Sequence, residues 1–215
     1  MRQTRADTER TREALLDAAE MLFWQRGPAI ASVLDIARSA GLTRGAFYYH
    51  FKDKRAVFEA LLERARAHER VLPDDLESRS GDALETLRDF CKNVFERFIE
   101  DQLQQRMFAI VMHRPEALGD LEPLARERRE EICRSVHAYQ RLLEWAEEDG
   151  RLAPGWTPRI AAITLYSTLI GLIDQWMRAP DRFDARNVGI ACLDQLFAAF
   201  AHRPQGGGLA DAGPA

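Results

Sequence analysis

Two short helices separated by one glycine are encoded in the stretch IARSAGLTRGAFYYHFKDKRAVF. Ser32 can cap a first helix over 33–39, whose apolar residues recur at helical spacing. Gly41 then supplies the left-handed backbone conformation that closes a helix. Thr43 can cap a second helix over 44–50, which has only about two turns and cannot fold alone. The two helices must therefore be held together by the rest of the chain.

The second helix has the length and side chains of a helix that enters the major groove of DNA. Phe47 is its expected inner anchor, which leaves an arginine, a glycine and two tyrosines on outer faces. An arginine there can fork onto a guanine edge, and tyrosine or histidine can donate to phosphate oxygens. Asp53 is the expected cap of the next helix, whose first residue carries an ammonium group. The predicted DNA-contacting residues are Ser32, Thr43, Arg44, Gly45, Ala46, Tyr48, Tyr49, His50 and Lys54.

A glycine turn between short helices also occurs in helical proteins that never bind nucleic acid, so the turn alone is a weak signal. The whole segment is more specific. It resembles the TetR family of transcriptional regulators, with an apolar-alanine pair at Ile36-Ala37, a turn at Gly41, a tyrosine-rich helix over 46–50 and a Phe-Lys-Asp-Lys exit over 51–54. The resemblance implies a DNA-binding regulator.

A looser resemblance covers most of residues 80 to 200. The segments 108–114 and 171–176, the latter followed by Ala179-Pro180, resemble efflux-pump repressors of the AcrR and TtgR type. This likeness implies a hydrophobic small-molecule effector.

The chain departs from the pattern of that family at several positions. Residues 28–31, Pro-Ala-Ile-Ala, replace the small hydroxyl residues that similar proteins often carry before the first helix of the motif. Tyr49 stands where many relatives have tryptophan, and both rings can carry a polar tip to the DNA backbone. Phe108 and Ile170 are apolar where relatives of this type often place a polar side chain in the pocket.

The fold class expected is all-α, with a three-helix helix-turn-helix domain followed by a second helical domain. Residues 1–55 are assigned to DNA binding, 56–203 to ligand binding and dimerisation, and 204–215 to a flexible tail. Residues 1–55 contain ten Lys or Arg against seven Asp or Glu, a net charge of +3, whereas the whole chain has −4. The basic end therefore coincides with the motif, although so small an excess means little alone.

Apolar spacing also predicts the other helices. A first helix begins at a cap, Asp7 or Thr8, and ends near Arg26, with Gly27-Pro28 as its stop. A fourth helix leaves the DNA-binding domain at Lys54 and can transmit movement along its length. A polar connection follows from Pro73 to Gly81. The predicted helices after the motif are 54–71, 83–101, 104–113, 121–149, 158–179 and 185–202.

The last two predicted helices favour a homodimer. The helix over 158–179 is apolar on more than one side, and the next carries a stripe that includes Leu193 and Phe200. One face can pack inside while another meets the same helices of a second copy, and this four-helix interface is what the resemblance implies. The alternative is that both helices only fill the core of a monomer.

A pocket for the effector is predicted from helix faces that carry large apolar residues with occasional polar ones. Such stripes are often ordinary core. Asp174 can meet a cationic drug or pair with Arg97 or Arg106, and His113 is expected to form a core or hinge hydrogen bond. The predicted ligand-contacting residues are Leu62, Ala65, Leu87, Cys91, Val94, Phe98, Phe108, Val111, Met112, Ser135, Tyr139, Tyr166, Ile170, Ile173 and Asp174.

Other classes of protein have little support in the sequence. The N-terminal stretch has no signal peptide and no apolar run reaches eighteen residues, so a cytoplasmic protein with no membrane partner is expected. Cys91, Cys133 and Cys192 are widely spaced and predict buried thiols, with a redox sensor as the alternative. Phosphate loops, nucleophile elbows and metal-ligand spacings are missing, so no enzyme, cofactor or metal site is predicted.

These observations lead to a homodimeric repressor on an inverted-repeat DNA operator, expected beside a multidrug efflux operon and released by a hydrophobic small molecule. A regulator of a metabolic pathway that senses one metabolite is an alternative. A small-molecule binding protein that has lost DNA recognition is another, because residues 28–31 depart from the family pattern.

Overall fold

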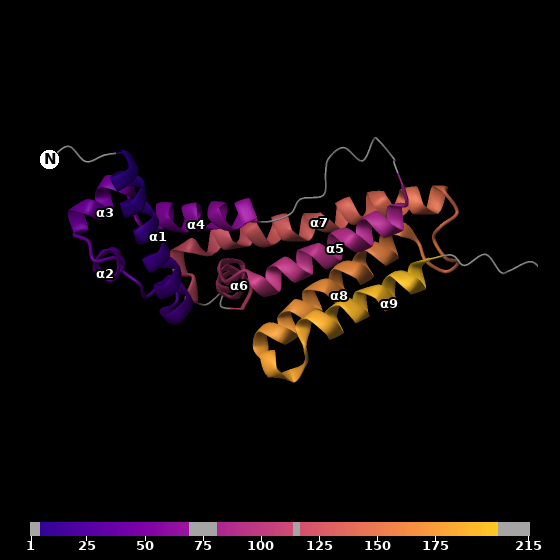
Figure 1. Ribbon diagram of the computed structural model, residues 1–215. Coiled ribbons are helices and arrows are strands. Elements are labelled where there is room, and N and C mark those ends of the chain that lie inside the picture. The colour runs from indigo at the N-terminus through magenta and orange to yellow at the C-terminus, as the bar shows by residue number, and fades with distance from the viewer. Residues whose placement is uncertain (1–4, 69–80, 114–116, 202–215) are drawn as a thin grey trace, which may run out of the picture.

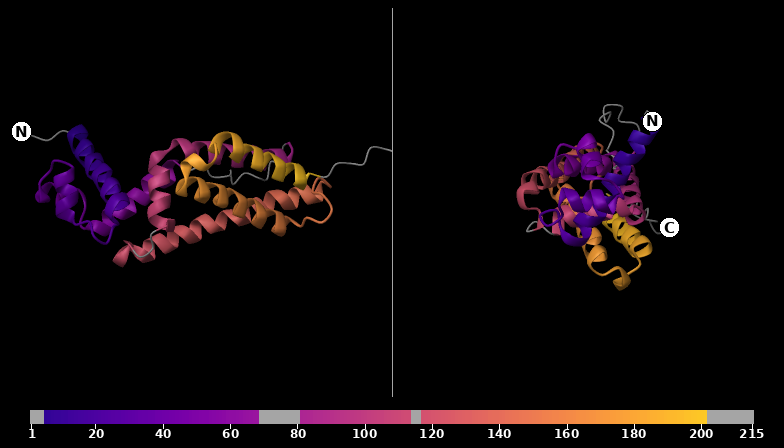
Figure 2. Two further views of the ribbon diagram at one scale, coloured as in Figure 1. Left: turned by 90° about the horizontal axis from the view of Figure 1, so that it is seen from below. Right: turned by 90° about the vertical axis from the view of Figure 1, so that its left-hand side faces the viewer.

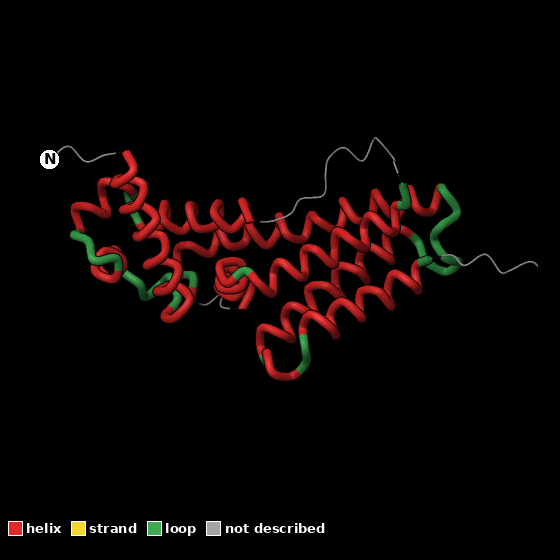
Figure 3. Tube along the Cα trace, in the orientation of Figure 1, coloured by secondary structure: helices red, strands yellow, loops and turns green. Residues whose placement is uncertain are grey.

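Helices make up nearly all the regular structure of residues 5–68, 81–113 and 117–201, which are the residues that the computed structural model describes (Figures 1 and 3). No β-strand is present in these ranges, which confirms the all-α prediction. The α-helices are α1 (Arg5–Arg26), α2 (Val33–Ser39), α3 (Arg44–His50), α4 (Lys54–His68), α5 (Ala83–Glu100), α6 (Gln102–Phe108), α7 (Glu122–Glu148), α8 (Pro158–Arg178) and α9 (Ile190–Phe200).

The helix-turn-helix forms as the local sequence predicts. The Ser32 hydroxyl accepts from the amide of Asp35 at 3.1 Å, and the Ser32 amide donates to the Asp35 carboxylate at 3.0 Å, so both ends of a capping box are present. Thr43 Oγ1 accepts from the Ala46 amide at 3.1 Å. Gly41 has a φ of 70°, the left-handed conformation expected there. These local bonds fix where α2 and α3 begin and end.

Buried apolar residues hold the short helices in place. Phe47 of α3 is fully buried, together with Ile36 and Ala37 of α2, and this confirms the predicted anchor. The predicted stripe of α1 is buried as well, at Leu15, Ala18, Ala19, Leu22 and Phe23.

Several predicted boundaries differ from the structure. The helix α1 already includes Arg5, so Asp7 and Thr8 lie inside it, and Asp7 pairs with Arg10 one turn later. The predicted helix over 104–113 is α6 followed by one π-helical turn, η2 (Ala109–His113). The last helix likewise opens with a π-helical turn, η6 (Ala185–Gly189), which the Asp184 carboxylate caps. Residues 69–71, most of the connection from Pro73 and the tail 204–215 lie outside the described residues.

The helices of the second part run beside one another, with α6 lying across them (Figures 1 and 2). Helices α7 and α8 pack together, and α5 lies against α7 and α9. The core of the first part extends beyond α1–α4, because it also contains Leu103 and Met107 of α6 and Leu124 near the start of α7. The division at residue 55 stays a prediction, and packing crosses it.

A backbone contact joins the loop before α2 to the loop before α7. The amide of Ala29 donates to the carbonyl of Ala117 at 2.8 Å. Gly27 has a φ of 84°, and a Cβ at that position would lie 2.7 Å from the Cβ of Ala117. Glycine is therefore required at residue 27 both by its conformation and by the close approach of the second loop.

The three cysteines differ in exposure. Cys91 is fully buried in the core of the second part, as predicted, whereas Cys133 and Cys192 are exposed and the prediction of buried thiols is wrong for them. Helical spacing alone does not reveal which positions of α7 and α9 are exposed. Burial raises the pKa of the Cys91 thiol to about 12.

Replacing Phe47 with alanine should reduce the free energy of unfolding by about 3–5 kcal/mol, because it removes a fully buried ring. Urea unfolding of both proteins, followed by circular dichroism, measures this. Tyr49→Ala is the matched control, since the Tyr49 side chain is 70% exposed. A loss no greater than that of the control would show that Phe47 does not anchor the motif.

Iodoacetamide at pH 8 should leave Cys91 unmodified in the native protein and modify Cys133. The reactive thiolate of Cys91 is scarce at this pH because burial raises its pKa, and the sulfur is also covered. Peptide mapping by mass spectrometry distinguishes the two, and labelling in denaturant should reach Cys91. Equal labelling of Cys91 and Cys133 in the native state would contradict the packing described here.

Candidate DNA interface and effector pocket

The outer surface of α3 carries the side chains predicted to contact DNA. Tyr48 and Tyr49 are 46% and 70% exposed, and Arg44 is exposed beside them. The guanidinium of Arg44 lies over the Tyr48 ring, 5.5 Å from its centroid, and donates to the Tyr48 hydroxyl at 3.4 Å. Ser32, Thr43 and Gly45 are also exposed, whereas Ala46 and His50 are half-buried. The arginine and tyrosine thus form one polar surface on a helix anchored from behind.

His50 lies at the edge of this surface. Its ring meets that of Tyr49 edge to face, with centroids 5.0 Å apart. Burial, together with the positive charge of Arg12, lowers the pKa of His50 from its usual value. His50 is therefore mainly neutral at pH 7 and offers one ring N–H rather than a positive charge.

The ammonium group of Lys54 is hydrogen-bonded within the protein. It donates to the carbonyls of Pro28 and Ala29, at 2.6 and 3.4 Å. The predicted Asp53 cap is present, because the Asp53 carboxylate accepts from the Ala56 amide at 2.8 Å. Lys54 thus holds the loop before α2 against the start of α4, and its contact with a phosphate stays a prediction.

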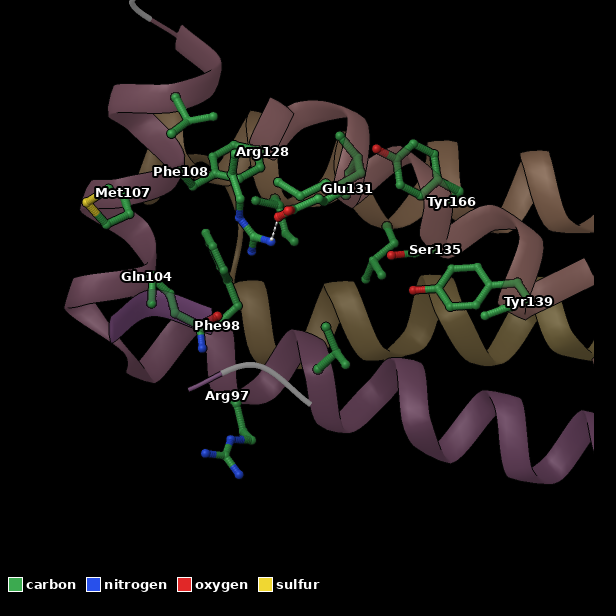
Figure 4. Close-up of a pocket in the computed structure, with 18 of the residues that line it drawn as sticks. Arg97, Phe98, Gln104, Met107, Phe108, Arg128, Glu131, Ser135, Tyr139 and Tyr166 are labelled. Carbon is green, nitrogen blue, oxygen red and sulfur yellow. Dashed lines mark hydrogen bonds and ion pairs between the residues drawn. The ribbon is translucent and has the colours of Figure 1, made fainter. Parts of the chain in front are cut away.

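A cavity of about 420 Å³ lies among α4, α5, α6, α7 and α8 (Figure 4). It lies well within the size range of small-molecule sites. Eleven of the residues predicted to contact a ligand line it: Leu62, Ala65, Val94, Phe98, Phe108, Val111, Ser135, Tyr139, Tyr166, Ile170 and Ile173.

Four predicted residues lie outside the cavity wall. Leu87 and Cys91 are fully buried in the adjoining core, and Met112 packs against the core of the first part. Asp174 is held by two partners: it lies 2.6 Å from Nε2 of His113 and accepts from Nε of Arg178 at 2.9 Å. These partners replace the arginines considered from the sequence, and the hydrogen bond predicted for His113 is confirmed.

The bond from Arg178, and then that from His113, lower the pKa of Asp174. Its carboxylate is therefore charged at neutral pH and already paired.

Sequence reasoning missed about half of the wall. The missed residues share no single chemistry, and the largest group lies on α7, where positions 128, 131, 135 and 139 recur every three or four residues on one face. Because Ser135 and Tyr139 are among the predicted ligand-contacting residues, this spacing indicates that positions 128 and 131 lie on the same face of α7. The residues missed are Phe90, Arg97, Gln104, Met107, Arg128, Glu131, Ile132, Ala138, Arg141 and Leu169.

An ion pair in the cavity wall connects α7 to α4. The Glu131 carboxylate accepts two bonds from Nη2 of Arg66, at 2.6 and 2.7 Å, and one from Nε at 3.1 Å. Arg128 donates to the same carboxylate at 3.0 Å, a bond drawn in Figure 4. Burial alone would raise the pKa of Glu131, but the two arginines outweigh it and the pKa is lowered. The carboxylate is therefore charged and shared by two guanidinium groups.

Groups of three or more His, Cys, Asp or Glu side chains able to hold a metal do not occur among residues 5–68, 81–113 and 117–201.

Within the same ranges, α8 is the one helix with the length and apolar composition to cross a membrane. A helix at the centre of a helical protein has the same properties, and α8 packs against α7 and α9. It is weak evidence for a membrane segment.

Comparison with known proteins gives the relationships of this chain. The model of the family "Bacterial regulatory proteins, tetR family" matches residues 15–61, and that of "MAATS-type transcriptional repressor, C-terminal region" matches residues 82–201. The repressor BepR of Brucella suis is 34% identical over 185 residues, which are 86% of this chain and 88% of BepR. AcrR of Shigella flexneri and TtgR of Pseudomonas putida, the type resembled in sequence, also match.

Solved structures agree with this relationship. NalD, the secondary repressor of the MexAB-OprM multidrug efflux pump in Pseudomonas aeruginosa, is 34% identical, with a TM-score of 0.73 over 91% of this chain and 98% of NalD. SmeT, the repressor of the Stenotrophomonas maltophilia pump SmeDEF, matches in its complex with triclosan at 31% identity, with a TM-score of 0.71 over 90% of this chain and 92% of SmeT. With both halves of the chain matched, the protein belongs to the TetR family of bacterial transcriptional regulators.

Proposed function

We propose that the protein is a cytoplasmic homodimeric repressor that binds an inverted-repeat operator and is released by a hydrophobic small molecule. The observation that carries the proposal is the course of α4. This helix begins at Lys54, directly after the DNA-reading helix α3, and places Leu62 and Ala65 in the wall of the cavity. One continuous helix thus begins four residues after the end of α3 and lines the cavity.

DNA recognition is assigned to α3. Its exposed Arg44 can reach a guanine edge in the major groove, and the tyrosine hydroxyls of Tyr48 and Tyr49 can donate to phosphates. A single helix of about two turns makes few contacts, so two copies on successive turns of DNA are needed for specific affinity.

Dimerisation is assigned to α8 and α9. Ile160 and Ile163 of α8 lie one turn apart and are 52% and 47% exposed in a single chain. Covering these side chains with the same face of a second copy removes apolar surface from water.

Release requires that the effector bind more tightly to the conformation that does not fit the operator. A ligand between α4 and α7 separates or draws together the two helices that Arg66 and Glu131 join.

Because NalD and SmeT repress multidrug efflux pumps, an efflux operon is the proposed target. No enzymatic activity is assigned.

Arg44→Ala and Tyr48→Ala should each weaken binding to the DNA upstream of the gene by about tenfold or more, because each removes a groove or phosphate contact. Electrophoretic mobility shift at fixed salt concentration measures this. Arg134→Ala, an exposed arginine of α7, is the control for lost positive charge. Wild-type affinity in both α3 variants would refute the assigned reading surface, and no shift with the wild type would refute the repressor.

A double variant, Ile160→Asp with Ile163→Asp, should convert the dimer to a monomer, because four carboxylates would be buried at the interface. Analytical ultracentrifugation measures the change, and circular dichroism checks that the fold survives. A dimer that persists in the double variant would place the interface elsewhere.

A further inference from the structure

The charged side chains in the cavity wall are mostly positive. Among the described residues that line the cavity, three are arginines, Arg97, Arg128 and Arg141, and one is an acid, Glu131. The remaining lining residues are neutral. The wall therefore has a formal charge of +2, which attracts anions and repels cations.

The acidic side chain is already occupied. Arg66, which lies outside the wall, donates the shortest hydrogen bond to each carboxylate oxygen of Glu131. Arg128 donates a further bond to the same carboxylate. A cationic ligand would have to displace a bidentate guanidinium to reach it, and would approach two arginines in doing so. Asp174, the other acid considered, lies outside the wall and is paired with His113 and Arg178.

The two ends of the cavity carry different polar groups. Figure 4 shows Arg97, Gln104 and Arg128 toward one end, from three different helices, with the hydroxyl groups of Tyr139 and Tyr166 toward the other. Arg97 is exposed, extends to the outside and forms no ion pair with any residue of the described ranges. Arg141 is thirteen residues beyond Arg128 on α7, about 20 Å along the helix axis.

Apart from the hydroxyl groups of Ser135, Tyr139 and Tyr166, the rest of the wall is apolar. It includes Phe90, Val94 and Phe98 of α5 and Leu169 and Ile173 of α8. A ligand that fills this space must bury a hydrocarbon or aromatic body, while its polar group is best placed at the end that carries Arg97 and Gln104.

We propose that the effector is an amphipathic anion, with its apolar body between α5 and α8 and its acidic group beside Arg97. The proposal rests on the function proposed above and specifies the chemical class of the effector. An exposed arginine contributes modestly to such an ion pair, so we expect a preference of about fivefold rather than absolute selectivity.

Three probes with the same twelve-carbon chain test this charge preference: dodecanoate, 1-dodecanol and dodecylamine, used below the concentrations at which they form micelles. Isothermal titration calorimetry gives their affinities, and fluorescence anisotropy of labelled operator DNA gives release. Dodecanoate should bind about fivefold more tightly than dodecanol, and dodecylamine more weakly than either. Added salt should reduce the advantage of dodecanoate and leave dodecanol unchanged.

Arg97→Gln should lower the affinity for dodecanoate to about that of dodecanol, and should leave the affinity for dodecanol unchanged. Arg134→Gln is the control for net charge on the surface of the protein, because Arg134 lies outside the cavity wall, and it should keep the preference for dodecanoate. A preference for dodecanoate that persists in Arg97→Gln would overturn the assignment to Arg97.

These measurements also distinguish failure of the proposed anion preference from failure of the proposed repressor function. If dodecanol or dodecylamine binds as tightly as dodecanoate and still releases the operator, the anion preference is wrong and the repressor function stands. If none of the three probes binds, the proposed effector class is overturned, and the mobility shift without ligand decides on DNA binding alone.

Discussion

The packing of α4 is the constraint on which the arrangement of both sites depends. Phe58 of this helix is fully buried, with its ring edge to face with that of Phe23 of α1, while Leu62 and Ala65, one and two turns later, line the cavity. Arg66 then binds Glu131 of α7. Because an α-helix is stiff over such a length, a displacement at its cavity end changes the position of the first core and of α3 with it. The two sites therefore cannot be repacked independently.

Two further contacts hold the first part of the chain against the second. Arg106 of α6 donates to the buried Glu20 carboxylate of α1 at 2.8 Å. Burial raises the pKa of Glu20 while the charge of Arg106 lowers it, so removing the arginine would leave an unpaired acid in the interior. The backbone bond from Ala29 to Ala117 connects the adjoining loops. The interface between the two parts thus has a charged contact and a main-chain contact besides the shared helix.

The helix-turn-helix was predictable because its capping bonds are local in the sequence. The contacts of the cavity and of Asp174 were harder to predict because they depend on tertiary packing. The caps at Ser32 and Thr43 depend on residues three positions away, so the sequence contains all of their information. The pairing of Asp174 with His113 joins residues 61 positions apart, and the wall residues of α7 depend on which face of a long helix meets the cavity. The bonds from Lys54 to the carbonyls of Pro28 and Ala29 were not predictable for the same reason, since those residues belong to a distant loop.

The π-helical turn Ala109–His113 has a consequence for how this pocket can vary. Such a turn contains one residue more than an α-helical turn, so every side chain after it points in a direction that regular periodicity does not give. Deleting one residue from the turn would restore regular winding and rotate Val111 relative to Phe108. Homologous chains that differ by a single residue in length here would enclose differently shaped guests with the same set of amino acids.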